Sequence, residues 1–400
     1  MKKEIVMKWN NVYAAAMCLG VLSVVGTARA AGPNDPNTTA RTLVEQCASI
    51  KKGDKVMISG RPTDMALLES IAVHVRKLGA FPMVSVTTDQ LARRMFDEVP
   101  AEFDSQTDAL GLKLAETLDV MISLDSMENP ALFAGASPAR LAARANAGTP
   151  VFETMLKKNV RQIVLGNGLF PTQATAQMYG IEREQLAATF WSGVNVDYAA
   201  LQSTGEKVKG LFESGKQVRI TNPNGTDLSF GIQNRPCFVS DGVISKEDLA
   251  KGGAACQVWL PAGEVFSTPV PGTTTGRIVF DRVLFEGKEI TGVTIDLKNG
   301  KVTSMTGGAG FEPIKAQYDA AGSGKDEFSM FDIGINPAVK LVPGTKLLNW
   351  VPAGMVTLGI GGNIWAGGTN DCAYGFTGFV PGSTVTIDGK AVVEKGTLKE

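Results

Sequence analysis

The stretch that decides the fold is Lys51–Val84, KKGDKVMISGRPTDMALLESIAVHVRKLGAFPMV. A short apolar run, Val56–Ser59, precedes an amphipathic segment that begins at Pro62 and stops at Gly79. Proline suits the first turn of a helix, and glycine suits the position after its last turn. A second apolar run, Phe81–Thr88, follows. This order predicts two parallel strands joined by a helix that covers the sheet.

The same alternation continues to about residue 214. We expect helices at 89–97, 106–118, 138–147, 182–191 and 198–214, and further strands that start at Asp119 and Arg161. The turns between these strands and helices contain neither GxGxxG nor GxxxxGK[ST], so dinucleotide and phosphate binding are not supported. The first half is therefore predicted to be an α/β domain with a parallel sheet and flanking helices.

The character of the chain changes near Gly215. The segment KQVRITNPNGTDLSFGI, which starts at Lys216, predicts a hairpin around an Asn-Pro-Asn-Gly turn, and GVTIDLKNGKVTSMT predicts a second one. The second half is predicted to be a β-rich α+β domain. The expected organisation is a signal peptide (1–30), a leader (31–38), the α/β N-terminal domain (39–210) and the β-rich C-terminal domain (211–400).

The first 30 residues have the pattern of a secretory signal peptide. Three lysines, at positions 2, 3 and 8, precede an apolar run over 12–26, and Ala28-Arg29-Ala30 has the small-x-small form of a cleavage site. We expect a periplasmic or secreted mature protein of about 370 residues, which is long enough for roughly two domains. No later segment is apolar enough to cross a membrane, and a net charge of -1 argues against nucleic-acid binding.

Cysteine and histidine usage limits the chemistry. Four cysteines follow the signal peptide, and Cys237 and Cys256 could form a disulfide; four buried thiols are the equally weighted alternative. The single histidine, His74, lies on the predicted Pro62–Gly79 helix between two valines, which is typical of a packed residue. A histidine-dependent Ser or Cys hydrolase is therefore not supported.

Several blocks, in order, resemble one family, the metal-dependent aminopeptidases typified by aminopeptidase T and aminopeptidase S. The blocks are KKGDKVMISGRPTDMALLESIAVHVRKLGAFPMV, FPTQATAQMYGIEREQLAATFW, VRITNPNGTDLSFGI, LPAGEVFSTPVPGTTTGRIVFD, DIGINPAVKL, TLGIGGN, GGTNDC and TVTIDGK. The resemblance spans nearly the whole mature chain. It implies the aminopeptidase T type of fold, a homodimer, and two divalent ions that activate a water to release an N-terminal residue.

The resemblance also implies five metal ligands, of which this sequence keeps one. Glu264 matches the glutamate of the family's Gly-Glu-Val-Phe element, although an exposed surface glutamate is the alternative interpretation. The other expected ligands are a glutamate, a histidine and a His-x-Asp pair, and a tyrosine is expected between them. The residues at these positions are Met330, Thr357, Gly375 and Thr377 for the ligands and Ile364 for the tyrosine.

Met, Thr and Gly do not supply the charged or imidazole ligands that a divalent pair needs. We therefore predict a protein without a cofactor, a pseudoenzyme that binds a small amine- or peptide-like ligand or serves as a structural partner. The alternative is an active aminopeptidase that holds zinc, cobalt or manganese with a substitute set, Glu264, Asp332, Asp371 and Cys372. The aromatic residues beside these elements would line a binding pocket or form part of the core; they are Trp259, Phe266, Trp350, Trp365, Tyr374 and Phe376.

Overall fold

The computed structural model describes residues 35–399, so the predicted signal peptide and the first half of the predicted leader lie outside the described residues. The described chain begins with helix α1 (Pro36–Arg41), which Asp35 caps, and continues into a π-helical turn, η1 (Thr42–Cys47). Within this range, no helix combines the length and the apolar character that a membrane span requires.

The predicted parallel sheet is present and has the strand order β2-β1-β3-β4-β8. Its strands are β1 (Lys55–Gly60), β2 (Phe81–Val86), β3 (Val120–Leu124), β4 (Arg161–Leu165) and β8 (Gln257–Leu260), and all neighbours pair in parallel. β1, β3 and β4 are buried almost throughout, as the central strands of a sheet covered on both faces should be. β8 follows the predicted domain boundary in sequence, so the C-terminal half supplies one strand of the N-terminal sheet.

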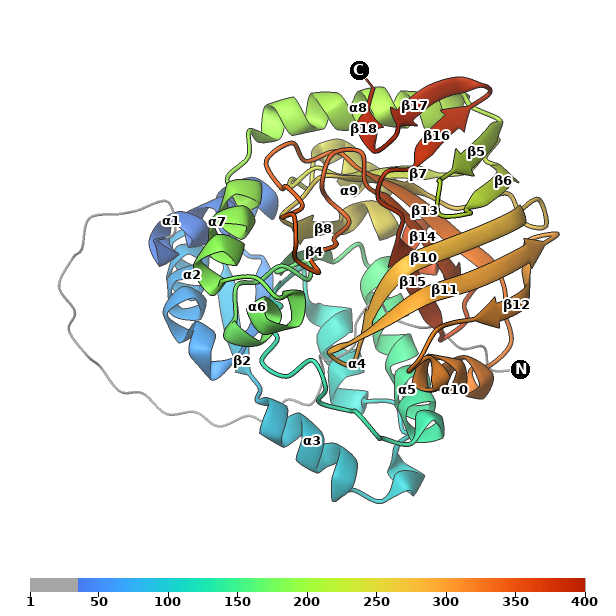
Figure 1. Cartoon of the computed structure of the whole chain (residues 1–400). Helices are drawn as coiled ribbons and strands as arrows, with labels where there is room; N and C mark the ends of the chain where they lie inside the picture. Colours follow the sequence, from blue (N-terminus) through green and yellow to red (C-terminus); the bar gives the residue numbers. More distant parts are fainter. Residues whose placement is uncertain (1–34, 400) are drawn as a thin grey trace.

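The other helices of the first half lie around this sheet, and the last of them runs along the antiparallel part of the molecule (Figure 1). They are α2 (Met65–Lys77), α3 (Asp89–Asp97), α4 (Ala109–Thr117), α5 (Pro138–Lys157), α6 (Gln173–Tyr179), α7 (Arg183–Val194) and α8 (Tyr198–Ser214), with short 3-10 turns η2 (Pro62–Asp64) and η3 (Ala101–Phe103). Side chains of Thr88, Asp108 and Asp197 accept hydrogen bonds from the first turns of α3, α4 and α8.

Helix α5 is longer than the sequence pattern predicts. It continues past Ala147 to Lys157 and contains Pro150. The added turns bury Val151, Phe152 and Met155 in the core, so tertiary packing outweighs the local cost of the proline.

The C-terminal half forms two antiparallel sheets. The first has eight strands in the order β12-β11-β10-β6-β5-β16-β17-β18, and the second has five in the order β15-β14-β13-β9-β7. The strands of the first are β5 (Gln217–Thr221), β6 (Asp227–Gly231), β10 (Thr275–Phe285), β11 (Lys288–Lys298), β12 (Lys301–Thr306), β16 (Thr384–Ile387), β17 (Lys390–Glu394) and β18 (Thr397–Leu398). Both predicted hairpins are present, as β5–β6 and β11–β12, and Asn299 and Gly300 have the positive φ angles that the tight second turn requires.

The five-stranded antiparallel sheet carries the positions that the resemblance marks as a metal site. Its strands are β7 (Cys237–Ser240), β9 (Glu264–Ser267), β13 (Phe328–Gly334), β14 (Val356–Gly361) and β15 (Gly375–Phe379). The remaining elements are α9 (Lys246–Lys251), α10 (Glu312–Ala320), η4 (Gly253–Cys256) and η5 (Ile364–Ala366). Figure 1 shows the antiparallel strands beside the parallel sheet, with α8 running along the top of the view.

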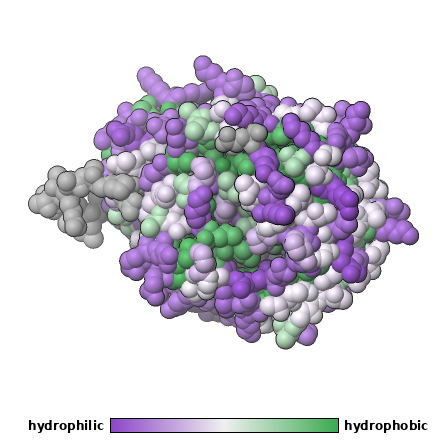
Figure 2. All heavy atoms as spheres, turned by 45° about the horizontal axis from the view of Figure 1, so that its top comes forward, coloured by the Kyte–Doolittle hydropathy of each residue, from purple (hydrophilic) through white to green (hydrophobic). Residues whose placement is uncertain are grey.

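Two hydrophobic clusters hold the layers together. The larger one joins α1, α2, α7 and α8 to both halves of the chain. The smaller one joins one face of the parallel sheet, at Met57, Met121 and Val164, to Phe266 and Met330 of the five-stranded sheet. Polar residues dominate the outer surface in Figure 2, with apolar residues gathered near the centre of that face.

Candidate functional site

Glu264 is a buried residue, and the interpretation of an exposed surface glutamate is therefore wrong. Only 1% of its surface is exposed. Its Oε1 accepts a hydrogen bond of 2.7 Å from Nδ2 of Asn167, which follows the carboxyl end of β4. Asn167 Nδ2 also donates to the carbonyl oxygen of Pro261, and Asn349 Nδ2 donates to the carbonyl oxygen of Asn167. This network fixes Glu264 at the junction of the parallel and five-stranded sheets.

Backbone register places Glu264 and two other polar residues on the same face of the five-stranded sheet. Glu264 on β9 pairs with Gly334 on β13. Asp332, two residues before Gly334 on β13, pairs with Phe266 on β9 and with Thr357 on β14. Directly opposed residues, and residues two apart on a strand, point to the same face. β13 separates β9 from β14, so Glu264 and Thr357 lie on strands about 10 Å apart.

The remaining ligand positions of the resemblance share that face. Met330 is opposite Gly359, and Gly359 is opposite Thr377. Gly361, two residues after Gly359 on β14, pairs with Gly375, two residues before Thr377 on β15. We call the surface that carries Glu264, Met330, Thr357, Gly375 and Thr377 the site face.

The site face is packed as a core around Met330. Met330 is fully buried in the smaller cluster with Phe266, Trp259 and Trp365. The ring centroids of Phe266 and Trp365 are 5.5 Å apart, and those of Trp259 and Trp365 are 6.1 Å apart. A methyl group added at Gly359 would lie 3.3 Å from Met330 Cγ. Apolar side chains therefore occupy the part of the face where an acidic ligand is expected.

A model of the thermophilic metalloprotease family, M29, matches residues 35–325. The chain belongs to the M29 family. Members of this family normally use divalent metal ions. The matched range includes Glu264 and ends before Met330, Thr357, Gly375 and Thr377.

Solved structures support the fold that the M29 match implies. Wild-type AmpT from Thermus thermophilus superimposes with a TM-score of 0.70 at 16% identity, over 92% of this chain and 99% of AmpT. The 2,5-dihydroxypyridine dioxygenase from Pseudomonas putida KT2440 gives a TM-score of 0.58 at 12% identity, over 92% and 98% of the two chains. No curated protein sequence matches. The predicted fold, an α/β domain with a β-rich domain of the aminopeptidase T type, is confirmed.

The residues present on the site face do not fit the family's metal pair. Thr357 is fully buried, and within residues 35–399 no group forms a hydrogen bond with its hydroxyl. Gly375 has no side chain. A methyl group added at Gly359 would lie 2.8 Å from Cγ2 of Thr377, so the Thr377 side chain lies against the backbone of Gly359. Ile364, at the position expected for the tyrosine, lies in η5 and packs against the smaller cluster. Zinc and cobalt sites are built from imidazole, carboxylate or thiolate ligands, which these residues lack.

The substitute ligands are not brought together as a set. Asp332 is fully buried in the middle of β13 on the site face. Asp371 and Cys372 lie in the segment before β15, where Cys372 packs beside Gly324 and its Sγ accepts a hydrogen bond from the Tyr374 N–H. Across residues 35–399, no three His, Cys, Asp or Glu side chains are placed to hold one metal ion.

The aromatic residues near the site face divide into four packing groups. Trp259, Phe266 and Trp365 belong to the smaller cluster. Trp350 packs edge-on against Phe379, with ring centroids 4.9 Å apart. Tyr374 packs against Tyr318, and Phe376 packs against Phe280. Each ring has an aromatic neighbour, which favours the interpretation as core.

A polar cluster at the carboxyl end of the parallel sheet was missed at the sequence level. Arg61 forms a 2.8 Å ion pair with Asp89, and the Arg61 backbone N–H and the Ser126 hydroxyl both donate to Asp64 Oδ2. Burial raises the pKa of Asp64, although these donors favour its charged form. We call Arg61, Asp64, Asp89 and Ser126 the edge cluster. Its sequence signal was available, because polar residues directly follow the predicted strands.

The described cysteines are buried, whereas His74 is only partly buried. The four described cysteines are buried and are not joined by disulfides, so the predicted Cys237–Cys256 alternative is absent from this structure. Burial raises the pKa of the Cys47 thiol to about 12 and that of Cys256 to about 11. The pKa of His74 is lowered, chiefly by burial and then by Lys77. None of these groups is activated for nucleophilic chemistry.

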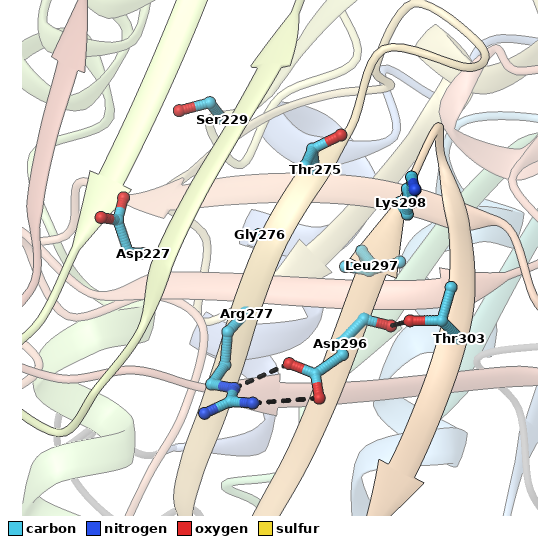
Figure 3. Close-up of a pocket in the computed structure, with 9 residues that line it drawn as sticks. All are labelled: Asp227, Ser229, Thr275, Gly276, Arg277, Asp296, Leu297, Lys298 and Thr303. Atoms are coloured by element: carbon cyan, nitrogen blue, oxygen red, sulfur yellow. Dashed lines mark hydrogen bonds and ion pairs between the residues drawn. The ribbon is translucent and has the colours of Figure 1, made fainter.

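An open groove of about 660 Å³ lies on the eight-stranded sheet, away from Glu264 (Figure 3). Its side chains come from β6, β10, β11 and β12. Arg277 pairs with Asp296 at 2.7 Å, and Asp227 pairs with Arg219 at 2.9 Å. The charges in this groove are largely matched within the sheet itself.

Proposed function

We propose that this M29 scaffold does not assemble a dinuclear metal centre and instead binds a small amine- or peptide-like ligand at Glu264. The observation that carries the proposal is the common face of Glu264, Met330, Thr357 and Thr377, where apolar packing around Met330 replaces a ligand carboxylate. A buried carboxylate that keeps its position without a metal pair is suited to a ligand's ammonium group.

The charge requirements of a metal pair support this proposal. Two divalent ions lose most of their hydration on binding, and charged ligands must compensate for that loss. Met330 offers a soft thioether, and Thr357 and Thr377 offer neutral hydroxyls. The register of β9 and β13 places the acidic residues Glu264 and Asp332 on the site face.

The experiment compares metal content and peptidase turnover in one preparation. Purified protein is analysed for zinc, cobalt, manganese and iron, and is then assayed on amino-acid anilides with and without added zinc or cobalt. The proposal predicts far less than one equivalent of metal and no turnover that a chelator suppresses. Metal near two equivalents with chelator-sensitive turnover would establish the alternative, an active aminopeptidase with substituted ligands.

We also propose that the protein is exported and acts as a homodimer. Export is supported by the basic start, the apolar run and the Ala28-Arg29-Ala30 site, and the homodimer is supported by the family resemblance alone. N-terminal sequencing of the periplasmic fraction is expected to begin at Ala31. Light scattering of the mature protein is expected to give twice the chain mass.

A further inference from the structure

The groove on the eight-stranded sheet is lined by polar side chains that the strand register places in rows across the strands. Arg277 on β10 is opposite Asp227 on β6 and Asp296 on β11. Thr275, two residues earlier on β10, is opposite Ser229 on β6. Directly opposed residues, and residues two apart on a strand, lie on the same face of a sheet. Figure 3 shows these side chains around the groove of about 660 Å³.

Two arginine–aspartate pairs at the groove keep hydrogen-bonding capacity for a ligand. Arg277 donates from Nε and Nη2 to the two carboxylate oxygens of Asp296, at 2.7 and 3.1 Å. Arg219 donates to Asp227 in the same way, at 3.1 and 2.9 Å. The four side chains are between 34% and 60% exposed. A guanidinium has five N–H donors and a carboxylate about four acceptor positions, so each pair presents unused donors beside unused acceptors.

The charges in the groove favour a neutral ligand. The nine residues that line it include two acids, Asp227 and Asp296, and two bases, Arg277 and Lys298, so their formal charges cancel. An anion or a cation would gain a strong partner only by breaking a bidentate pair. A neutral ligand with neighbouring hydroxyls can accept from the guanidinium and donate to the carboxylate while the pair stays intact.

The remaining side chains of the lining add hydroxyl and aliphatic groups. Ser229, Thr275 and Thr303 carry hydroxyls, and the Thr303 hydroxyl donates to the Asp296 carbonyl oxygen at 3.2 Å. The threonine methyl groups and Leu297 supply apolar surface between the polar groups. Small-molecule sites combine apolar surface with a few placed polar groups in this way. Sugar rings match this pattern, because their hydroxyls lie at the ring edge and their C–H groups on the ring faces.

We propose that this groove binds a neutral, extended glycan that crosses strands β6, β10, β11 and β12. Neighbouring strands are about 4.8 Å apart, which is close to the length of one sugar ring in an extended chain. Successive rings therefore lie over successive strands. Their hydroxyls bind the Arg277–Asp296 pair and the hydroxyls of Ser229 and Thr275. The site is separate from Glu264 and requires neither a metal nor a ligand there.

A second copy of the chain fits this groove less well than a glycan. The buried core of a stable protein–protein interface is depleted of charged residues. Four of the nine residues that line the groove are charged, namely Asp227, Arg277, Asp296 and Lys298. This composition favours a small polar ligand over a subunit contact.

The test measures binding of cellohexaose, a neutral and extended glycan, to the mature protein by ligand-observed NMR. Hexagalacturonate carries a carboxylate on each ring and hexaglucosamine an ammonium, so they are charged controls of equal length. We expect cellohexaose to bind with a Kd on the order of 1 mM, because it forms a few neutral hydrogen bonds in contact with water. The charged controls should bind at least about tenfold more weakly. Tighter binding of either control, or no binding of cellohexaose at about 10 mM, would overturn the assignment.

Two pairs of variants locate the site on the protein. Arg277→Met should weaken cellohexaose binding about tenfold and Thr275→Val about threefold, because each removes hydrogen bonds to the glycan. Arg94→Met breaks a comparable exposed ion pair on α3, and Thr291→Val removes an exposed hydroxyl elsewhere on β11. Both controls should stay within about twofold of the parent. Unchanged affinity in Arg277→Met and Thr275→Val would overturn the assignment of the groove.

Light scattering of Arg277→Met separates a glycan site from a subunit contact. We expect the variant to have the same mass as the parent. A dimeric parent that becomes monomeric on this substitution would make the groove a subunit interface and would overturn the glycan assignment. The metal content of the protein tests the proposed function alone and leaves this inference unchanged.

Discussion

The edge cluster and the site face handle buried polar groups in different ways. In the edge cluster, Arg61 pairs with Asp89, and Asp64 receives donors from Arg61 and Ser126. On the site face, neutral or apolar residues stand at four of the five ligand positions, and the aromatic core extends to Met330. The comparison teaches that one scaffold can carry a paired polar network at the end of one sheet and a mainly apolar face on the next.

The largest expected effect comes from removing an aromatic ring from the site face. Phe266→Ala should lower the free energy of unfolding by about 3–5 kcal/mol, because Phe266 is 2% exposed and packs against three rings. Urea denaturation measures this. Phe81→Ala, at a ring that is 56% exposed, is the control and should cost far less. A loss below about 1 kcal/mol for Phe266→Ala would show that the face is not packed as core.

A substitution in the edge cluster should lower the free energy of unfolding by removing the partner of a buried charge. Arg61→Met leaves the Asp89 carboxylate without its ion-pair partner and should cost about 3 kcal/mol, because both side chains are largely buried. Arg277→Met breaks an exposed pair with Asp296 and should cost about 0–1 kcal/mol. Thermal unfolding at low and high salt compares the two variants. Equal losses would mean that burial does not distinguish these pairs.

The hydrogen bond from Asn167, at the end of the parallel sheet, to Glu264 on the site face is tested by substitution of Asn167. Asn167→Gly removes the donor to Glu264 and tolerates the positive φ of 45°, and it should cost about 1–3 kcal/mol. Asn299→Gly, at an exposed turn with a φ of 52°, is the matched control and should be nearly neutral. If the two variants lose the same stability in urea, the Asn167 bond does not help to hold Glu264.

The smallest expected effect concerns Asp241, which follows β7 at the edge of the five-stranded sheet. Burial raises the pKa of Asp241 to about 6. The folded state therefore binds more protons than the unfolded state between about pH 4 and pH 6, and stability falls as pH rises through this window. Asp241→Asn keeps the acceptor for the Val243 N–H. It should be about 1–2 kcal/mol more stable than the parent at pH 8 and equal to it below pH 4.

That difference is measured by urea unfolding of both proteins across the pH range. Parallel curves for the parent and the variant would contradict the assignment, because the variant lacks the titrating group.

The sequence predicted the bounds of those helices whose first and last residues carry local capping signals. Helix α8 has the predicted bounds because Asp197 caps its start and Gly215 follows its end. The fifth parallel strand, β8, was not predicted, since its pairing with β4 joins segments about 95 residues apart. Pairing at such separation depends on tertiary packing and leaves little trace in a local pattern.

The candidate site was predictable only as far as the family motif extends. Glu264 could be named from its block, but its burial and its bond to Asn167 depend on the meeting of two sheets. The place of Asp332 on the same face follows from the two-residue period of a strand, once β13 is known to be a strand. The unsatisfied hydroxyl of Thr357 has no sequence signal, because it reflects what surrounds the residue.

The most direct test of the central claim is the metal content of the mature protein after equilibration with zinc, cobalt and iron followed by gel filtration. The account predicts well under 0.1 equivalent of each metal per chain, since the site face lacks the ligands that would retain it. About two equivalents, lost when Glu264 is changed to Gln, would contradict the account.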